Sequence, residues 1–192
     1  AYARAVAAAC EESMIVTLPQ GERTKNLDNH RYLLARMLQA GFTRSDRVIA
    51  VGGGVMGDLA GFAAAVYMRG IAFYNVPTTL LSQVDSSIGG KVAVDMDGVK
   101  NIVGAFYPPK KVVIDSNVLA TLPPRQVSAG LAESIKMAAT CDAALFESIE
   151  RSESLDQDLD AIIEGSLRIK RSVVEQDPLE TGLRRVLNFG HT

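Results

Sequence analysis

The stretch RVIAVGGGVMGD, residues 47–58, decides how the rest of the chain is interpreted. Its first five residues form an apolar, β-branched run typical of a buried strand. Three glycines follow directly, and the residues from Asp58 to about Met68 have helical character. Gly52, Gly54 and Gly57 match the G-x-G-x-x-G spacing, in which the missing Cβ lets backbone amides approach a pyrophosphate at a helix N-terminus. The stretch therefore predicts a strand, a tight turn and a helix.

The glycine spacing alone has two interpretations, because close packing of a helix on a strand also favours glycine. The standard dinucleotide fold carries an acidic residue about 20 residues after the glycines, where it binds the adenine ribose. This chain has Phe73, Tyr74 and Asn75 in that region. We therefore expect a variant of the site, in which Asp58 and the hydroxyls of Thr78 and Thr79 bind polar groups of a nucleotide.

Outward from this stretch, strand and helix patterns alternate, which predicts an α/β fold with a parallel sheet. After Pro123-Pro124 only helical patterns remain, at about 125–151 and 156–176, so we place a domain boundary near Leu122, between residues 1–122 and 123–192. The other expected helices are Tyr2 to about Glu12 and Leu27 to Ala40, with Leu33, Leu34, Met37 and Leu38 on one side. The other expected strands are Met14–Leu18, Ile71–Val76, Lys91–Val94 and Lys111–Asp115.

The composition excludes several classes of protein. Hydrophobic residues make up 47% and charged residues 22%, and apolar segments recur along the chain, which excludes a disordered protein. The net charge of −2 gives no basis for a nucleic-acid partner, and no membrane partner is expected. Cys10 and Cys141 fit no metal or redox spacing, so we expect two free thiols in a reducing cytoplasm. Both ends look cut, which suggests a piece of a longer chain.

A polar segment, DSSIGGK (85–91), lies between expected core strands and offers an acid, two hydroxyls and a lysine. Arg69 and the pair Lys100-Asn101 add further polar groups. They could be solvated loop charges, but lysine, arginine and asparagine together suit a ligand that carries phosphate and carboxylate.

Glu133 and Lys136 lie three residues apart on one face of an expected helix. A surface ion pair would explain them, but the small residues Gly130, Ala132, Ala138 and Ala139 indicate a closely packed helix. Of the two histidines, His30 lies in an ordinary helical pattern and His191 lies near the end of the chain. A lone histidine is more often structural than a metal ligand.

Six segments, in their order and spacing, resemble the 3-dehydroquinate synthases, a family of sugar-phosphate cyclases. The resemblance covers residues 19–192. The segments are GGGVMGD (52–58), YMRG (67–70), VPTTLLSQVDSSIGGK (76–91), VKNIVGAFYPP (99–109), GLAESIK (130–136) and RVLNFGHT (185–192).

The resemblance implies a dinucleotide-binding α/β domain followed by a truncated, mostly α-helical domain that binds metal and substrate. It also implies a cytoplasmic homodimeric lyase of aromatic amino acid biosynthesis that needs NAD and zinc or cobalt. The implied reaction converts 3-deoxy-D-arabino-heptulosonate 7-phosphate to 3-dehydroquinate and phosphate, with NAD recycled in each turnover.

The resemblance also assigns residues. It places Arg69 in the site of a neighbouring subunit, and it puts the third metal ligand and an N-terminal acidic strand outside this chain. The implied metal ligands are Glu133 and His191, and the implied catalytic residues are Lys91, Lys136, Lys170, Arg184 and Asn188. Substrate contacts are implied at these five and at Arg69, Asp85, Lys100 and Asn101. Cofactor contacts are implied at Glu22, Lys25, Gly53, Gly54, Val55, Asp58, Thr78, Thr79, Asp85, Ser86, Lys100, Thr121 and Leu122.

Three alternatives remain open. The chain could belong to a related cyclase, such as a 2-deoxy-scyllo-inosose synthase, or to a metal-dependent polyol dehydrogenase. The dehydrogenase would need no phosphate-binding bases, so DSSIGGK and Lys100-Asn101 argue against it. The third alternative is a non-catalytic piece that binds nucleotide or a partner. Because one metal ligand and one edge of the cofactor site are expected outside the chain, we expect weak or no activity from these 192 residues alone.

Overall fold

The computed structural model describes residues 1–190 of the chain. The chain folds into two compact units. The first unit comprises residues 1–76 and 90–113, and the second comprises residues 77–89 and 114–192. The segment 77–89, which contains Thr78 and Asp85, therefore belongs to the second unit, although the sequence places it between strands of the first.

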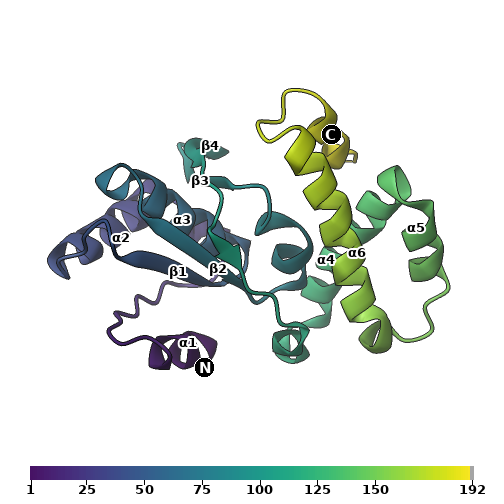
Figure 1. Ribbon diagram of the computed structural model, residues 1–192, viewed down its shortest axis with the longest axis horizontal. Coiled ribbons are helices and arrows are strands. Elements are labelled where there is room, and N and C mark those ends of the chain that lie inside the picture. The colour runs from purple at the N-terminus through teal and green to yellow at the C-terminus, as the bar shows by residue number, and fades with distance from the viewer. Residues whose placement is uncertain (191–192) are drawn as a thin grey trace. The chain divides into compact units, whose positions relative to one another are not determined.

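The first unit is built on a three-stranded sheet in the order β1-β2-β5, formed by β1 (Arg47–Gly52), β2 (Ala72–Pro77) and β5 (Lys111–Val112). Strands β2 and β5 run parallel, with Tyr74 opposite Lys111. Helix α3 (Gly54–Val66) follows β1 after a single residue and packs against it, as Figure 1 shows. The predicted α/β fold with a parallel sheet is confirmed.

Helix α3 supplies much of the core of this unit, which explains why its composition is so apolar. Leu59 and Ala64 of α3 are fully buried against Phe73 of β2 and Val94 of β3. Gly61 permits this close packing, because a Cβ there would lie 2.5 Å from Cγ1 of Val92 and 2.9 Å from Cε1 of Phe73. Helix α2 (Leu27–Gln39) is capped by Asn26, whose side-chain oxygen accepts a 2.9 Å hydrogen bond from the Asn29 backbone N–H.

A β-hairpin is the main element that the sequence analysis missed. Strand β3 (Lys91–Met96) pairs antiparallel with β4 (Val99–Phe106), where only Lys91–Val94 had been expected as a strand. Asp97 and Gly98 form the turn with φ of 52° and 81°, the left-handed conformation that a two-residue type I′ hairpin requires. The Asp-Gly dipeptide was the available signal.

Four features differ from the prediction. Met14–Leu18 forms no strand: the segment is extended and Leu18 packs on the core, but Ile15 is 47% exposed and no ladder partner lies among the described residues. Helix α3 begins at Gly54 rather than Asp58, because the glycine turn leads straight into it. Leu38 of α2 is 72% exposed, so it does not share the buried side with Met37. Helix α1 is shorter than expected and spans Tyr2–Ala8.

The second unit is mostly helical, as predicted, and its described residues contain no complete strand. Its helices are α4 (Pro124–Cys141), α5 (Ala143–Glu150) and α6 (Leu155–Gln176), which pack on one another (Figure 1). The expected helix at 125–151 is two helices, because the Asp142 side chain accepts a 3.0 Å hydrogen bond from the Leu145 N–H and starts α5. Shorter 3₁₀ helices span Glu22–Thr24 and Tyr67–Arg69 in the first unit, and Ser116–Thr121 and Leu183–Asn188 in the second.

A short π-helix at Ser82–Ser86 packs against both α4 and α6. Gly130 of α4 allows the approach, because a Cβ there would lie 2.5 Å from the backbone nitrogen of Leu81. Gln83, fully buried, holds the segment by donating hydrogen bonds to the backbone oxygens of Pro77 and Asp115 at 3.2 and 2.8 Å. The core of the unit forms around Leu80, Val84, Met137 and Ile163. π-Helices are rare and often mark functional sites.

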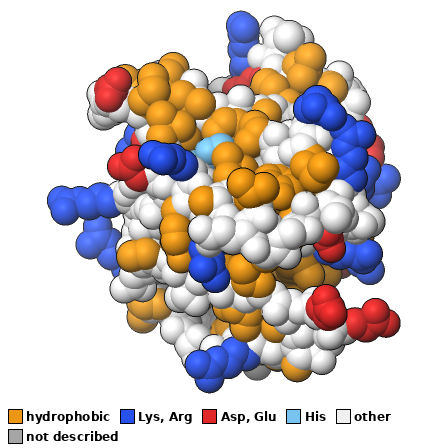
Figure 2. Space-filling view, turned by 90° about the vertical axis from the view of Figure 1, so that its left-hand side faces the viewer, with side chains coloured by type: hydrophobic (Ala, Val, Ile, Leu, Met, Phe, Trp, Pro, Cys, Tyr) orange, Lys and Arg blue, Asp and Glu red, His pale blue; other side chains and the backbone are white. Residues whose placement is uncertain are grey.

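The surface of the described residues carries two thiols and several exposed apolar side chains. Cys10 and Cys141 are exposed free thiols. Within residues 1–190, none of the helices has the length and apolar character needed to cross a membrane. Figure 2 shows hydrophobic side chains gathered on the face seen from the left of Figure 1, with charged side chains mostly toward its edges. In the first unit Leu38, Val66, Ile102 and Phe106 are among the exposed apolar side chains.

Candidate functional site

The N-terminus of α3 is open to an anionic ligand. Its first residue, Gly54, follows the cap residue Gly53, no side chain caps the helix, and the first turn carries no acidic residue. Free backbone N–H groups and the helix dipole favour a phosphate group there. Gly57 is close to the Asn75 amide, since a Cβ would lie 2.9 Å from Nδ2 of Asn75. Asn75 is buried, and its Oδ1 has no hydrogen-bond partner among the described residues. This turn fits the pyrophosphate of a dinucleotide.

A second set of polar residues in the first unit surrounds the ammonium group of Lys25, a side chain only 5% exposed. The Lys25 Nζ donates to Oδ1 of Asn101 at 2.7 Å and to Oδ2 of Asp58 at 3.1 Å. It also forms an ion pair with Glu22 at 3.3 Å. We call Glu22, Lys25, Asp58 and Asn101 the Lys25 cluster. Three predicted cofactor residues and one predicted substrate residue are thus brought together.

The pKa values of two residues in the Lys25 cluster are shifted by burial and by neighbouring charges. Burial raises the pKa of Asp58 to about 6, although the Lys25 ammonium acts in the opposite direction. The pKa of Lys25 is raised: burial lowers it, but the carboxylates of Asp58 and Glu22 outweigh that effect. Asp58 is therefore poised to exchange a proton near neutral pH.

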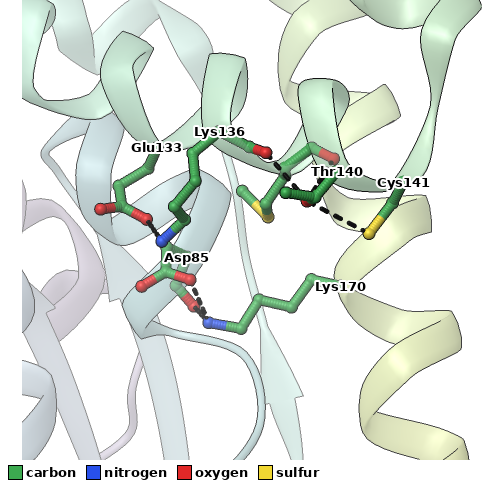
Figure 3. Close-up of polar contacts among 7 residues, drawn as sticks. Asp85, Glu133, Lys136, Thr140, Cys141 and Lys170 are labelled. Carbon is green, nitrogen blue, oxygen red and sulfur yellow. Dashed lines mark hydrogen bonds and ion pairs between the residues drawn. The ribbon is translucent and has the colours of Figure 1, made fainter. Parts of the chain in front are cut away.

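The second unit carries a different set of charges, shown in Figure 3. Lys170 of α6 donates to Oδ1 of Asp85 at 2.5 Å and to its backbone oxygen at 2.6 Å. In Figure 3 the ammonium groups of Lys136 and Lys170 both point toward Asp85. The pKa of Lys170 is lowered, chiefly by burial and further by the positive charges of Arg184 and Lys136, while Asp85 opposes the shift. We call Asp85, Lys136, Lys170 and Arg184 the basic cluster.

Arg184 is 3% exposed and is fixed on both sides. Its Nη1 donates to the backbone oxygens of Pro178 at 2.8 Å and Gly89 at 3.1 Å. Gly89 has φ of 100° and approaches so closely that a Cβ would lie 2.2 Å from Nη2 of Arg184. Only glycine allows both this backbone conformation and this contact. The guanidinium is therefore held next to the DSSIGGK segment.

The implied metal site is described only in part. Glu133 of α4 forms an ion pair with Lys136 one turn along, and both side chains are largely buried, at 17% and 11% exposure. A partly buried carboxylate on a rigid helix is a suitable ligand for zinc or cobalt, so Glu133 fits the role. His191, the other implied ligand, lies outside the described residues. Among residues 1–190 no group of three metal-binding side chains converges.

The remaining predicted residues lie at several places in the two units. In the first unit Arg69 is exposed with φ of 68°, Lys91 begins β3 and is exposed, and Lys100 is 71% exposed and 3.6 Å from Glu22. Val55 is in the first turn of α3.

In the second unit Thr79 Oγ1 accepts from the Ser82 N–H at 3.3 Å, and Asn188 donates to Oε1 of Glu180 at 2.6 Å. Thr78 directly follows β2, Ser86 ends the π-helix, and Thr121 and Leu122 end the 3₁₀ helix at Ser116–Thr121.

Two carboxylates that organise these clusters were missed. Asp95 of β3 accepts from the Asn101 N–H at 2.9 Å. Asp177, at the end of α6, accepts from the backbone N–H groups of Thr181, Gly182 and Arg184 at 2.8–2.9 Å. These hydrogen bonds, that of the Arg184 N–H first, lower the pKa of Asp177 to about 2. The hairpin signal pointed to Asp95, whereas nothing local in the sequence singles out Asp177.

Comparisons with known proteins identify the family of the chain. The model of the 3-dehydroquinate synthase N-terminal region matches residues 15–129, and that of the C-terminal region matches residues 130–192. A 3-dehydroquinate synthase of Campylobacter concisus (strain 13826) is 47% identical over 183 residues, which are 95% of this chain and 53% of that relative.

Two solved structures are also similar. A 2-deoxy-scyllo-inosose synthase complexed with carbaglucose-6-phosphate, NAD+ and Co2+ superposes with a TM-score of 0.87 at 31% identity, over 99% of this chain and 54% of that one. The 2-epi-5-epi-valiolone synthase ValA from Streptomyces hygroscopicus subsp. jinggangensis 5008, with NAD+ and Zn2+ bound, gives 0.82 at 30% identity, over 98% and 55%.

The chain spans about half the length of the curated relatives that it matches, which is 53% for the Campylobacter protein. The two family models together account for residues 15–192, and the glycine turn, the Lys25 cluster and the basic cluster all lie within that range. On these grounds the chain belongs to the 3-dehydroquinate synthase family.

Proposed function

We propose that this chain carries the dinucleotide site and most of the substrate-binding groups of a 3-dehydroquinate synthase. The whole protein would convert 3-deoxy-D-arabino-heptulosonate 7-phosphate to 3-dehydroquinate and phosphate. One observation carries the proposal: three buried or half-buried cations, Lys136, Lys170 and Arg184, lie around Asp85 in the second unit, where Glu133 also pairs with Lys136 and Asp177 with the Arg184 backbone. Burying three neighbouring cations is costly, and an anionic ligand would stabilise them.

The basic cluster suits a substrate with both a phosphate and a carboxylate. Arg184 offers a planar guanidinium that can bind an oxyanion through two N–H groups, while Lys136 and Lys170 offer point charges. Because Arg184 is held by two backbone oxygens and Lys170 by Asp85, the cations are already oriented before substrate arrives. Holding a flexible sugar phosphate in one conformer supplies much of the acceleration expected of such a site.

NAD fits the glycine turn and the Lys25 cluster of the first unit. The N-terminus of α3 would bind its pyrophosphate, and Glu22, Lys25 and Asp58 would bind ribose hydroxyls or the nicotinamide amide. The two solved cyclases that resemble this chain contain NAD+. Bound NAD supplies a hydride acceptor that returns the hydride later in the same turnover.

A divalent metal is the second proposed cofactor, with Glu133 and His191 as ligands and a third ligand outside this chain. The similar cyclases contain Co2+ or Zn2+. When bound, such a metal acts as a Lewis acid on a substrate oxygen. The Glu133–Lys136 ion pair suggests that Lys136 holds the carboxylate in place and keeps a donor next to the metal site.

We propose a cytoplasmic homodimer as the assembled form. The exposed Arg69 would reach the neighbouring subunit's substrate, as the family resemblance implies. The exposed apolar side chains of the first unit are consistent with surface that a second subunit covers.

Calorimetric titration of NAD into this chain, with and without zinc, tests the cofactor site. Saturable binding would support it, and no binding under either condition would contradict it. For turnover, a protein of the relatives' length should release phosphate from 3-deoxy-D-arabino-heptulosonate 7-phosphate without accumulating NADH. Phosphate-free turnover with NADH release would instead indicate a polyol dehydrogenase.

A related cyclase with another sugar phosphate is the second candidate, favoured by the fold similarity to 2-deoxy-scyllo-inosose synthase. The identity to that enzyme is 31%, against 47% to the Campylobacter 3-dehydroquinate synthase, which favours the first candidate. Parallel assays with a hexose 6-phosphate would separate the two: ring closure of that substrate, with none of the heptulosonate, would overturn the proposal.

A further inference from the structure

Asp95 joins two segments of the Lys25 cluster, and the proposed function gives its carboxylate no role. Asp95 is the fifth residue of β3 and lies opposite the segment that carries Lys25. Its backbone N–H donates to the Lys25 carbonyl oxygen at 2.9 Å, and Asn26 and Asp95 form an isolated parallel bridge. The main chain of Asp95 therefore fixes the main chain of Lys25.

The side chain of Asp95 acts on a different segment. Its Oδ1 accepts a 2.9 Å hydrogen bond from the backbone N–H of Asn101, on the opposite strand of the hairpin. Asn101 has φ of 55°, a left-handed conformation that non-glycine residues adopt only when other contacts stabilise it. The ladder register also shifts between Val94 and Met96, so Asp95 sits at an irregularity in the hairpin. The carboxylate supplies a contact that the regular ladder does not.

The two segments meet at one atom. The Lys25 ammonium donates to Oδ1 of Asn101 at 2.7 Å, so the backbone of each partner is held by Asp95 while their side chains bind each other. Asp58 is the other hydrogen-bond acceptor of that ammonium, and the charge of Asp95 acts on its carboxylate. A single residue thus fixes the two segments that carry the cation and the amide, and its charge acts on a carboxylate from a third segment.

We propose that Asp95 is a positioning residue for the dinucleotide: it presets Lys25 and Asn101 in the arrangement that binds NAD. The inference rests on the proposed function for its ligand. Asp95 itself does not contact NAD in this scheme. It keeps the Asn101 amide oxygen on the Lys25 ammonium, so that the ammonium meets the cofactor without first having to be ordered.

The test uses three variants of the 192-residue chain and calorimetric titration of NAD. Asp95→Ala removes the acceptor for the Asn101 N–H and should weaken NAD binding about tenfold, the size expected for a charge-assisted hydrogen bond. Asp95→Asn keeps an acceptor oxygen and should weaken binding only about threefold. Asp97→Asn, in the same turn and exposed, is the matched control and should change binding by less than about twofold.

Nuclear magnetic resonance supplies a readout that a merely structural role would not move. The Asn101 amide resonance should shift in Asp95→Ala, because the acceptor of its hydrogen bond is lost, and it should shift less in Asp95→Asn, which keeps an acceptor oxygen. The Lys25 ammonium protons should exchange faster with water in Asp95→Ala, while thermal unfolding shows whether the variant is folded.

The outcomes separate this inference from the proposed function. A folded Asp95→Ala chain that binds NAD as tightly as the wild type would overturn the inference and leave the proposed function intact. A wild-type chain that does not bind NAD would overturn the proposed cofactor site and the ligand assigned here. If in addition the Asn101 and Lys25 signals were unchanged in Asp95→Ala, the positioning role itself would be wrong.

Discussion

The Lys25 cluster and the basic cluster each have a buried lysine bonded to an aspartate, but the other charges that act on that lysine are negative in the first and positive in the second. In the first unit one ammonium group faces Asp58 and Glu22, and the pKa of Lys25 is raised. In the second unit one carboxylate faces Lys170 with Arg184 and Lys136 nearby, and the pKa of Lys170 is lowered by burial and by these like charges.

This difference in charge indicates which kind of ligand each cluster suits. The Lys25 cluster is already neutral or negative, so it suits neutral hydroxyl and amide groups, such as those of a nucleoside. The basic cluster holds three cations close together and suits a ligand that brings negative charge with it. In this chain the charges around the lysine distinguish the set proposed to face the nucleotide from the set proposed to face the substrate.

Among the variants considered, Lys170→Met should cause the largest loss of activity and so test the role of the basic cluster most directly. Without the ammonium, turnover of a protein of the relatives' length should fall at least about 100-fold in kcat/KM, because a positioned cation is lost. Asp85 loses its main partner, but its side chain is 28% exposed and Arg184 remains near, so the free energy of unfolding should fall by only about 2 kcal/mol.

Arg171→Met is the matched control for Lys170→Met. Arg171 is the next residue of α6, but it is 76% exposed and pairs only with Glu175 at the surface. Activity and stability should be close to those of the wild type. Equal loss of activity in the two variants would show that the charge of α6 as a whole, rather than Lys170, matters.

Two helix glycines allow the packing of the two units to be compared. Gly130→Ala in α4 would place a Cβ against the Leu81 backbone, which cannot rotate away, and should cost about 2 kcal/mol of unfolding free energy. Gly61→Ala in α3 meets side-chain atoms of Val92 and Phe73, which can shift, and should cost about 1 kcal/mol.

Chemical denaturation measures both glycine variants, and Ala139→Ser on the exposed side of α4 should stay within about 0.5 kcal/mol of the wild type. In an exposed helix, alanine would instead stabilise by about 1 kcal/mol relative to glycine. A stabilised Gly130→Ala chain would therefore refute the close contact between α4 and the π-helix.

Asp58→Asn should change how stability depends on pH in the first unit. Because burial raises the pKa of Asp58 from 3.8 to about 6, the folded chain holds a proton that the unfolded chain loses first. The free energy of unfolding should therefore fall as pH rises from about 4 to about 6, and Asp58→Asn should remove that part of the slope. Thermal unfolding in this pH window checks it, and an identical slope in both proteins would contradict the shift.

Asp177→Asn should show the opposite slope, at lower pH and with the smallest effect. Hydrogen bonds lower the pKa of Asp177 to about 2, below its ordinary value of 3.8. The stabilisation it gives is present above about pH 4 and is lost as pH falls toward about 2. In Asp177→Asn this acid-dependent loss should be absent. The Arg184 amide resonance, which reports on the same hydrogen bond, should shift in the variant even if the unfolding curves do not separate.

The sequence pattern predicted the parallel sheet and the helical second part, whereas the family resemblance supplied most of the polar residues that meet in the clusters. Strong local signals explain this success, since the run at 47–58 and the helical patterns after Pro124 each depend on nearby residues. The Met14–Leu18 strand was wrong because an apolar run does not reveal whether a pairing partner exists. The β4 strand was missed because its residues are exposed on both faces and lack a clear alternation.

Which residues share a cluster was harder to predict. Lys25 and Asn101 lie 76 positions apart, and Lys170 and Asp85 lie 85 apart, so nothing in the local pattern joins them. Asp95 and Asp177 were missed because each accepts hydrogen bonds from backbone N–H groups. The type of a residue does not reveal which backbone N–H group will contact it. The assignments of single residues to cofactor and substrate stay predictions.

The π-helix at Ser82–Ser86 has a consequence for how this family can change over time. Asp85 reaches Lys170 because one extra residue widens that turn. Loss of a single residue there would restore an α-helix and rotate everything beyond it by about 100°, which would turn the carboxylate away from α6. Substitutions in this segment can be absorbed one at a time, but a change in length cannot. Insertions and deletions among related genes should therefore collect at places such as the exposed turn after α2 and be absent between Leu81 and Ser87.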